Sequence, residues 1–528
     1  MIMDFAVCIT PILLLIALMT KPNGWPSHIS LPLTALLVYS VKLLYFADDP
    51  NWINATLVRG LLSAGTPILI ICGAILMFKT MERSGAMDLI RQWLNEISDN
   101  RVAQLMIVGW AFAFIIEGAS GFGTPAALAA PILVGMGFAP LRVAVLCLVM
   151  NSVPVSFGAV GTPTWFGMGQ LGLTEAELLR ISFYSATIHA VAAAIIPPIA
   201  LLFVVNRQEV WRNIVFVYLS IASCIVPYVM LSWISYEFPA LLGGACGFIV
   251  TLVAANHGIG LAKDDVDRSV ASSATPVAAL VKATFPLWGS VLVLVATRIP
   301  QLGIKTLLTD RTPAFGVGLG SFGDLSVSRS AVITLDRIFG ANVSWTFETL
   351  YVPALIPFFL ITVISIALYR VSLSAVKELL FESCQRMIQP IIALLGALVM
   401  VKLLMVGEEH SMVMINGNSF ADVTGDRWGY AAAFLGALGS FFSGSATISN
   451  LTFGGIENAI AIELHLDPAI ILSMPSVGAA FGNMVSINNI VAVCSVLGIT
   501  HREGEILKKT VGPMLLYGLI AAFVGQFL

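Results

Sequence analysis

Apolar segments long enough to cross a lipid bilayer recur along nearly the whole chain. As a helix, a stretch of about 20 apolar residues spans a bilayer. Only 11% of the 528 residues are charged and 58% are hydrophobic, whereas soluble domains average about 25% charged residues. The sequence therefore predicts an all-α polytopic membrane protein with roughly 12–14 spans. We expect these at 5–20, 29–47, 63–80, 101–117, 141–158, 181–205, 212–232, 239–256, 284–298, 351–371, 387–407, 429–443, 468–490 and 508–527.

Charge and cysteine usage exclude other classes. The net charge is −3, so the chain lacks the basic footprint of a nucleic-acid-binding protein. The seven cysteines are scattered and form no CxxC pair, which indicates small apolar residues rather than disulfides or metal ligands. No cofactor is predicted. The first 20 residues lack a basic leader, so we expect a first span rather than a removed signal.

One short stretch, "EGASGFGTP" (117–125), does not suit a lipid-facing helix. Glycine and proline weaken helices and free backbone groups that need partners. Irregular backbone at membrane depth is tolerated only where protein or a water-filled cavity satisfies it. A similar stretch, "SGSATISNLTFGG", occupies 443–455. We expect the two to form the tips of re-entrant hairpins.

The chain carries an internal repeat. "PILIICGAILMFK" (67–79) matches "PIIALLGALVMVK" (390–402), and at the same offset Ser120, Gly121 and Thr124 fall on Ser443, Gly444 and Thr447. One further residue of shift aligns "MNSVPVSFG" (150–158) with "MPSVGAAFG" (474–482). We therefore predict a first transmembrane repeat at 1–205 and a second at 285–528. Residues 206–284 supply connecting spans and a polar mid-chain loop, and the polar stretch 299–350 looks like another loop.

Charged residues indicate that the two repeats have inverted topology. Lys and Arg mark cytoplasmic loops. The segment after the third span, "KTMERSGAMDLIRQWLNEISDNR", is basic, but its counterpart "GEEHSMVMINGNSFADVTGDR" is acidic. The segments before these spans, "ADDPNWINATLVR" and "RVSLSAVKELLFESCQR", show the opposite difference.

Each predicted repeat also contains an interrupted helix. Pro154, Gly158, Gly161 and Pro163 break the first one, and Pro475, Gly478 and Gly482 break the second. Inverted repeats with interrupted segments at equivalent positions indicate the binding site of a secondary transporter. Helix N-termini at such tips present unpaired N–H groups and partial positive charge, which favours a carboxylate or another small anion.

The motifs "EGASGFGTPAALAAPILVGMGF", "MNSVPVSFGAVGTPTWFG" and "SFFSGSATISNLTFGG" resemble the lactate permease family of bacterial monocarboxylate transporters. The resemblance covers most of the chain. It implies import of L-lactate, D-lactate or glycolate with protons across the bacterial inner (plasma) membrane. It also implies an elevator-type ion transporter fold. A homodimer is compatible with this interpretation, although the sequence does not determine the oligomeric state.

The candidate substrate-binding residues share small polar side chains or glycine at the hairpin tips and helix breaks: Ser120, Gly121, Gly123, Thr124, Asn151, Ser443, Ser445, Thr447, Ser449 and Asn483. We expect tip N–H groups and hydroxyls to hold a carboxylate, and the two asparagines to contact the substrate hydroxyl or line the cavity. Such residues also mediate close helix packing in membranes, which is the alternative at each position.

Two ionisable residues are candidates for proton coupling. Glu117 directly precedes the first tip, and intramembrane carboxylates are functional candidates by default. His189 suits a proton relay because histidine titrates near neutrality. The alternatives are a glutamate that caps backbone N–H groups and a histidine satisfied in the protein core. Lys79 and Lys402 are repeat-equivalent and lie toward span ends, where snorkelling is expected.

Three rival functions compete with this interpretation. The same tips are chemically suited to binding Na⁺ in a transporter of another organic anion, such as a dicarboxylate. A membrane-embedded enzyme is disfavoured because the chain contains no HExxH, no GxSxG and no metal-spaced His/Cys cluster. A channel fits two-fold repeats with hairpins poorly.

Overall fold

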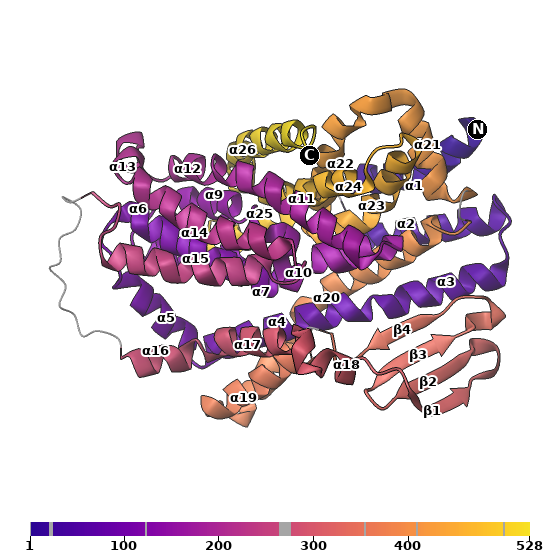
Figure 1. Ribbon diagram of the computed structural model, residues 1–528, viewed down its shortest axis with the longest axis horizontal. Coiled ribbons are helices and arrows are strands. Elements are labelled where there is room, and N and C mark those ends of the chain that lie inside the picture. The colour runs from indigo at the N-terminus through magenta and orange to yellow at the C-terminus, as the bar shows by residue number, and fades with distance from the viewer. Residues whose placement is uncertain are drawn as a thin grey trace. The chain divides into compact units, whose positions relative to one another are not determined.

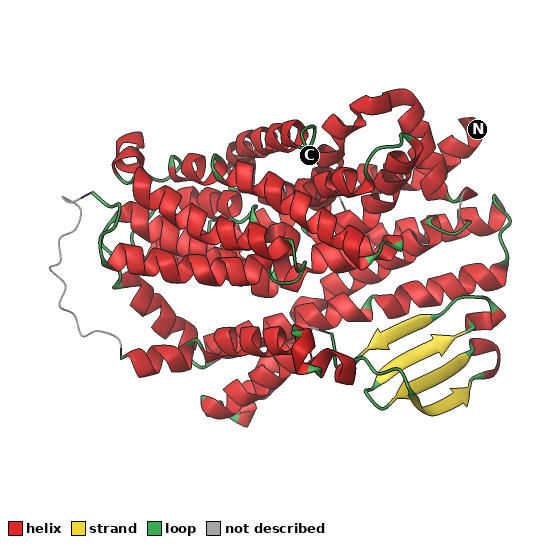
Figure 2. Cartoon of the chain, in the orientation of Figure 1, coloured by secondary structure: helices red, strands yellow, loops and turns green. Residues whose placement is uncertain are grey.

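The computed structural model describes residues 2–20, 25–121, 124–262, 276–352, 355–407, 410–499 and 502–528. The described part of the chain is mainly helical and carries one β-sheet (Figures 1 and 2). It divides into two compact units, each assembled from two separate stretches of sequence. Unit 1 comprises Met1–Asp88 and Val281–Ser419, and unit 2 comprises Leu89–Leu280 and Phe420–Leu528. Each unit thus draws on both predicted repeats.

Unit 1 contains the first four helices, the sheet and the longest helix. Its elements are α1 (Ile2–Thr20), α2 (Ser27–Leu44), α3 (Pro50–Ser63), α4 (Gly65–Arg83), α17 (Phe285–Arg298), α18 (Ile304–Leu308), β1 (Pro313–Gly318), β2 (Asp324–Ser328), β3 (Val332–Asp336), β4 (Trp345–Glu348), α19 (Ile361–Leu368) and α20 (Leu373–Leu404). Three further helices lie at the unit boundaries: α5 (Ala86–Asn95), α16 (Val277–Ala283) and α21 (Met412–Thr424). Close packing of α20 against α2 depends on a glycine, because a Cβ at Gly396 would lie 2.5 Å from the Pro32 nitrogen.

The sequence prediction of a loop over 299–350 is wrong for most of that segment. Residues 313–348 form a four-stranded antiparallel sheet in the order β1-β2-β3-β4, with Val317 opposite Leu325 and Leu325 opposite Leu335. The sheet packs beside α3 through a cluster that includes Ala55, Ile338 and Val343. Its strands are short, and β1 is exposed along its whole length. The apolar alternation that identifies a strand is therefore weak here, and the glycines resemble turn signals.

Unit 2 contains the two motifs that the sequence singles out. Its α-helices are α6 (Arg101–Gln104), α7 (Ala113–Ser120), α8 (Thr124–Gly135), α9 (Pro140–Met150), α10 (Gly158–Thr162), α11 (Glu175–Ala193), α12 (Ile196–Leu201), α13 (Arg207–Arg212), α14 (Ile214–Ser232), α15 (Pro239–Asn256), α22 (Gly429–Ser443), α23 (Ala446–Glu463), α24 (Pro468–Gly482), α25 (Ile487–Leu497) and α26 (Glu503–Val524). A π-helical stretch, Leu105–Phe112, joins α6 to α7.

The described residues contain eight helices long and apolar enough to cross a membrane, or up to ten if each of two bent pairs forms one span. This is fewer than the predicted 12–14. Several predicted spans are shorter helices, including Met3–Met19 and Gly429–Ser443. The segment predicted at 181–205 is divided between α11 and α12, where Pro197 and Pro198 follow the break.

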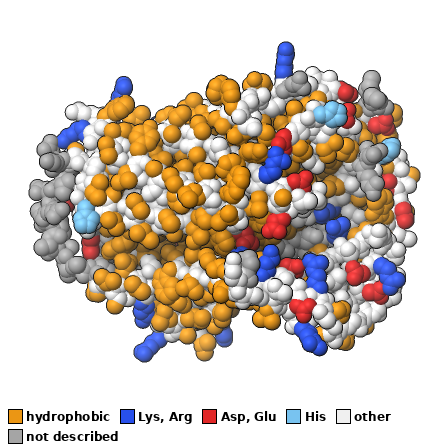
Figure 3. All heavy atoms as spheres, viewed as in Figure 1, with side chains coloured by type: hydrophobic (Ala, Val, Ile, Leu, Met, Phe, Trp, Pro, Cys, Tyr) orange, Lys and Arg blue, Asp and Glu red, His pale blue; other side chains and the backbone are white. Residues whose placement is uncertain are grey.

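Exposed apolar side chains support a membrane setting. In α14, Val215 is 64% exposed and Met230 is 68% exposed. Hydrophobic side chains also cover much of the helical surface on the face drawn in Figure 3. A soluble protein rarely exposes such continuous apolar surface, so these side chains are suited to contact lipid.

A helix ends at each of the two predicted tips, and another begins shortly after it. Helix α7 ends at Ser120 and α8 begins at Thr124, while α22 ends at Ser443 and α23 begins at Ala446. Gly121 and Gly444, which the repeat aligns, have φ angles of +61° and +71°. Their ψ angles differ, at −157° and +17°, so Gly444 is in the left-handed helical region while Gly121 lies in a region open essentially to glycine alone.

The two helix breaks differ from each other. Helix α9 and the segment after Pro154 are bent by 59°. Helix α24, by contrast, continues through Pro475 and Gly478 and ends at Gly482, so the predicted breaks at those two positions are wrong. A Cβ at Gly478 would meet the Ala433 carbonyl oxygen at 1.8 Å. This glycine therefore serves close packing between α22 and α24 rather than interruption.

Candidate functional site

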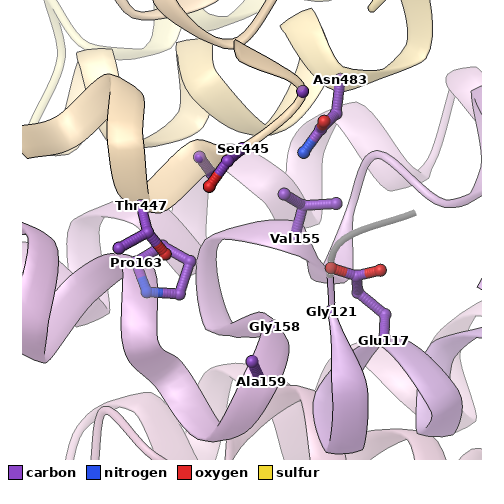
Figure 4. A pocket seen from close by; sticks show the side chains of 11 residues that line it. Glu117, Gly121, Val155, Gly158, Ala159, Pro163, Ser445, Thr447 and Asn483 are labelled. Carbon is purple, nitrogen blue, oxygen red and sulfur yellow. The ribbon is translucent and has the colours of Figure 1, made fainter. Parts of the chain in front are cut away.

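A small pocket lies within unit 2, where the second hairpin tip meets the first break and the end of the first hairpin helix (Figure 4). The lining combines polar groups with small apolar ones: Glu117, Gly121, Val155, Gly158, Ala159, Pro163, Gly444, Ser445, Ala446, Thr447 and Asn483.

The N-terminus of α23 forms one wall of the pocket. Ser445 caps this helix because its hydroxyl accepts a 3.3 Å hydrogen bond from the Ile448 N–H. The first turn of a helix carries N–H groups without intrahelical partners and a partial positive charge. The pocket is therefore lined by the end of an 18-residue helix that favours an anion.

Two side chains beside this helix end retain donor groups. Among the residues that the structure describes, the Thr447 hydroxyl has no hydrogen-bond partner, although the side chain is only 1% exposed. The Asn483 Oδ1 accepts a 2.7 Å hydrogen bond from Asn489, which directs the Asn483 amide nitrogen away from that contact (Figure 4). The Thr447 hydroxyl and the Asn483 NH₂ group are thus available to a ligand.

Glu117 contributes the only carboxylate among the described lining residues. It is 2% exposed, and its Oε2 accepts a 3.0 Å hydrogen bond from the Asn151 amide. No Lys or Arg of the described chain forms an ion pair with it. Gly158 makes room for the carboxylate, since a Cβ there would lie 2.4 Å from the Glu117 Oε1.

A left-handed turn beside Glu117 completes the wall that the first break supplies. Ala159, Val160 and Gly161 have φ angles of +46°, +57° and +71°. Non-glycine residues in this region cost about 1–3 kcal/mol each, so surrounding contacts must hold them. The Trp165 indole donates a 2.9 Å hydrogen bond to the Val160 carbonyl, and the Thr162 hydroxyl donates to the Ala159 carbonyl. The strained turn is therefore fixed by its own neighbours.

The pocket includes five of the predicted site residues: Glu117, Gly121, Ser445, Thr447 and Asn483. Three predicted hydroxyls instead donate to backbone carbonyls: Ser120 to Ile116 at 2.8 Å, Ser443 to Gly439 at 2.7 Å, and Ser449 to Gly436 at 2.7 Å. Asn151 contacts Glu117 and is not a lining residue of the described pocket. Gly123 lies outside the described residues, and only the backbone of Thr124, at the start of α8, is described.

His189 lies in a separate, fully buried network. Its Nε2 is 2.8 Å from the Ser156 hydroxyl and its Nδ1 contacts the Tyr517 hydroxyl. The Ser156 hydroxyl also donates a 3.0 Å hydrogen bond to the Ser476 carbonyl, which can only accept. Ser156 must then accept from the His189 Nε2–H, which leaves Nδ1 as the acceptor for Tyr517. A neutral histidine satisfies this arrangement completely, as a structural role requires.

Other charged residues, including the two repeat-equivalent lysines, do not line this pocket. In unit 1, Lys79 pairs with Glu82 at 2.9 Å and with Glu382 at 3.5 Å, while Lys402 is only 9% exposed. In unit 2, Glu457 is fully buried and its Oε2 accepts a 2.6 Å hydrogen bond from the Trp428 indole. No group of three potential metal ligands occurs among the described residues.

Sequence reasoning missed the apolar part of the lining. Val155, Ala159 and Ala446 carry no polar group, and nothing in their residue types distinguishes them from core packing positions. Their proximity to the break and the second tip was the available signal. Glycines 158 and 444 appeared in the motifs, but only as helix-breaking or repeat-matched residues.

Comparison with known proteins assigns the family. The family model for L-lactate permease matches residues 4–528. A provisionally named L-lactate permease of Haemophilus influenzae is 52% identical over 526 residues, covering 100% of this chain and 98% of that protein. The L-lactate permease of Bacillus subtilis is 25% identical, covering 92% and 89%. The glycolate permease GlcA of Escherichia coli is 22% identical, covering 94% and 90%.

Two solved structures align along most of the chain. MtrF of Neisseria gonorrhoeae gives a TM-score of 0.46 with 12% identity, covering 97% of this chain and 96% of that one. The YdaH transporter of Alcanivorax borkumensis gives 0.45 with 14% identity, covering 95% and 96%. The assignment does not depend on these modest structural scores, because the sequence match alone extends from residue 4 to residue 528. The chain is a multi-pass membrane protein and belongs to the L-lactate permease family.

Proposed function

We propose that the chain imports L-lactate and the related 2-hydroxy monocarboxylates D-lactate and glycolate by proton symport across the bacterial inner membrane. The observation that carries this proposal is the pocket in unit 2, where a helix N-terminus and free donors lie in the same small space as a buried carboxylate. The names of the relatives, L-lactate permease and glycolate permease, supply the substrate class.

The substrate carboxylate is suited to the α23 end of the pocket. The N–H groups of the first turn and the Thr447 hydroxyl supply donors, and the helix dipole favours the negative charge. The Asn483 amide nitrogen supplies another donor that a 2-hydroxy group can accept. Gly444 and Gly121 line the pocket without side chains, so a small ligand can approach their backbone.

Glu117 is the proposed proton carrier. A charged carboxylate buried in a membrane protein without a cation is costly, and protonation removes that cost. Importing an anion against an inside-negative potential costs about 2.3 kcal/mol per charge for each 100 mV, which one accompanying proton cancels. A single carboxylate that shares the pocket with the anion site therefore matches the needs of symport. His189 is the weaker candidate because its hydrogen bonds are complete without a proton change.

We further infer that residues 1–205 and 285–528 form inverted repeats that move substrate by an elevator motion. The matched hairpins support the repeat, because Ser120 and Ser443 make the same backbone hydrogen bond and Gly121 and Gly444 both have positive φ. The inversion rests on the loop charges. Because each compact unit draws one stretch from each repeat, the two units offer two bodies for such a motion. A homodimer is the assembly we propose to test.

Uptake of labelled L-lactate into proteoliposomes containing only this protein tests the proposal. An inward proton gradient and an inward sodium gradient are imposed separately, with unlabelled D-lactate, glycolate and succinate as competitors. We expect proton-driven uptake that both 2-hydroxy monocarboxylates block. Uptake that requires sodium, or that only succinate blocks, contradicts the substrate and coupling assignment and favours a sodium-coupled carrier of another organic anion.

A further inference from the structure

Val155 lies at the centre of the pocket lining. In Figure 4 its side chain stands between the Ser445–Thr447 wall on one side and Glu117 on the other. It is 2% exposed and packs in a cluster with Ala446, Ala479 and Ala480. The polar groups proposed to hold a carboxylate and a proton therefore flank a branched aliphatic side chain.

The remaining apolar lining is smaller or fixed by the backbone. Ala159 and Ala446 end at Cβ, and Ala159 lies in the left-handed turn, where larger residues are strained. Pro163 has a fixed φ, and its carbonyl accepts a 2.9 Å hydrogen bond from the Asn450 amide. Val155 lies in a short 3₁₀ stretch with ordinary φ, so its size can change without backbone strain.

The repeat alignment identifies a smaller counterpart of Val155. At the offset that matches "MNSVPVSFG" with "MPSVGAAFG", position 155 falls on Ala479. Ala479 is itself fully buried and belongs to the same packed cluster. The wider side chain is thus present only in the half that also supplies Glu117.

We propose that Val155 is the residue that selects the substrate by the size of its substituent on carbon 2. This inference rests on the proposed function. With the carboxylate at the α23 end and the hydroxyl on the polar side, the carbon 2 substituent faces the apolar surface that Val155 provides. That substituent is a hydrogen in glycolate and a methyl group in lactate. A difference of one methylene in an apolar pocket discriminates substrates by about 10–200-fold.

Competition experiments with size variants test this role. For each variant, the concentration of unlabelled acid that halves labelled L-lactate uptake is measured for glycolate, L-lactate and 2-hydroxybutanoate. Val155→Ala enlarges the pocket, so 2-hydroxybutanoate should become about tenfold more effective as a competitor relative to L-lactate. Val155→Ile narrows the pocket, so L-lactate should become about tenfold less effective as a competitor relative to glycolate.

Two further variants separate size from other effects. Val155→Thr keeps the shape of valine and replaces one methyl group with a hydroxyl, so its ratios between acids remain close to those of the parent protein. Val149→Ala removes the same atoms from a buried position of α9 outside the lining, and it leaves the ratios unchanged. If Val155→Ala does not accumulate in membranes, the Ile and Thr variants decide the question.

The outcomes distinguish this inference from the proposed function. If glycolate and L-lactate compete in the parent protein but the ratios are the same in Val155→Ala and Val155→Ile, size selection by Val155 is wrong and the transport proposal stands. If neither acid competes in the parent protein, both proposals are wrong. A change of ratio in Val149→Ala equal to that in Val155→Ala also overturns the inference.

Discussion

The Asn151 amide donates a 3.0 Å hydrogen bond to the Glu117 carboxylate within unit 2. The Asn151 Oδ1 is buried and has no partner in the described structure. The NH₂ group of Asn151 therefore donates to the charged Glu117 carboxylate. If the amide rotates, its Oδ1 can instead accept a hydrogen bond from the protonated carboxyl group. Asn151 is thus suited to hold Glu117 in both protonation states.

Replacing Glu117 with glutamine should separate exchange from accumulation. The carbonyl of the introduced side-chain amide can still accept a hydrogen bond from Asn151, but the amide cannot carry a proton. We expect Glu117→Gln to retain exchange of internal for external L-lactate in proteoliposomes and to lose accumulation driven by a proton gradient. Accumulation equal to that of the parent protein would exclude Glu117 as the proton carrier.

A methyl group at position 158 should disable the same site. The added Cβ of Gly158→Ala would lie 2.4 Å from the Glu117 Oε1, so the carboxylate must move. We expect roughly a tenfold lower uptake rate at a similar amount of protein in the membrane, since an overpacked site costs about 1–3 kcal/mol. Gly135→Ala is the matched control because nothing lies within 4 Å of its added Cβ. Equal losses in the two variants would refute the specific effect.

The effect of deleting a hydroxyl should depend on which group that hydroxyl already binds. Thr447→Ala removes a free donor, and because a hydrogen bond to a charged group is worth about 1.5–3 kcal/mol, half-saturation for L-lactate should rise about tenfold or more. Ser445→Ala removes a helix cap and should cost about 0.5–2 kcal/mol of stability. In Ser120→Ala, only a bond to the same helix is lost, and uptake should change little. If Ser120→Ala alone greatly raised the L-lactate concentration at half-saturation, this assignment of roles would be contradicted.

His189 should prove structural. Because it bridges Ser156 and Tyr517, His189→Asn and Tyr517→Phe should each lower the thermal unfolding temperature of the purified protein. Their double variant should lose less than the sum, since both act on one network. Proton-driven uptake should persist in the folded fraction of each. If His189→Asn lost proton-driven uptake but still exchanged internal for external L-lactate, the histidine would instead lie on the proton path.

The buried Glu457 provides a contrasting prediction about stability. Its Oε1 has no partner in the described structure, and the Trp428 indole binds the other oxygen. Glu457→Gln removes a buried charge and keeps an acceptor for the indole, so it should raise the unfolding temperature. Trp428→Phe removes the hydrogen-bond donor. It should cost about 1–3 kcal/mol of stability and therefore lower the unfolding temperature. A lower unfolding temperature for both variants would show that the charge itself is stabilising.

The sequence predicts the helix ends at both tips and the first interrupted helix because glycine and proline act directly on the backbone. Gly121 and Gly444 occur where the chain needs positive φ, and the repeat identified them as a pair. The second break was misplaced because glycine has two uses: Gly478 permits close packing against the Ala433 carbonyl inside a continuous helix. Residue type alone does not separate these uses.

The hydroxyl predictions show a similar limit. Serines at 120, 443, 445 and 449 look alike in sequence, yet only Ser445 lines the pocket. Each of the other three satisfies a backbone carbonyl, a choice set by local geometry. Val155 could not be predicted because an aliphatic side chain at a site resembles one in a core. The sheet escaped detection because its strands are short and only partly buried.

Unit 2 is assembled from two distant stretches of sequence, which constrains how the chain is synthesised and inserted into the membrane. The carbonyl of Pro163 accepts its hydrogen bond from the amide of Asn450, and the hydroxyl of Ser156 donates to the carbonyl of Ser476. Ser156 and Pro163 are synthesised hundreds of residues before their partners, so the nascent segment around the first break must reside in the membrane without these contacts. Domains with such distant contacts assemble late and expose unpaired groups until they do. Chaperone or translocon dependence should therefore end only when the last helices of the chain have been inserted.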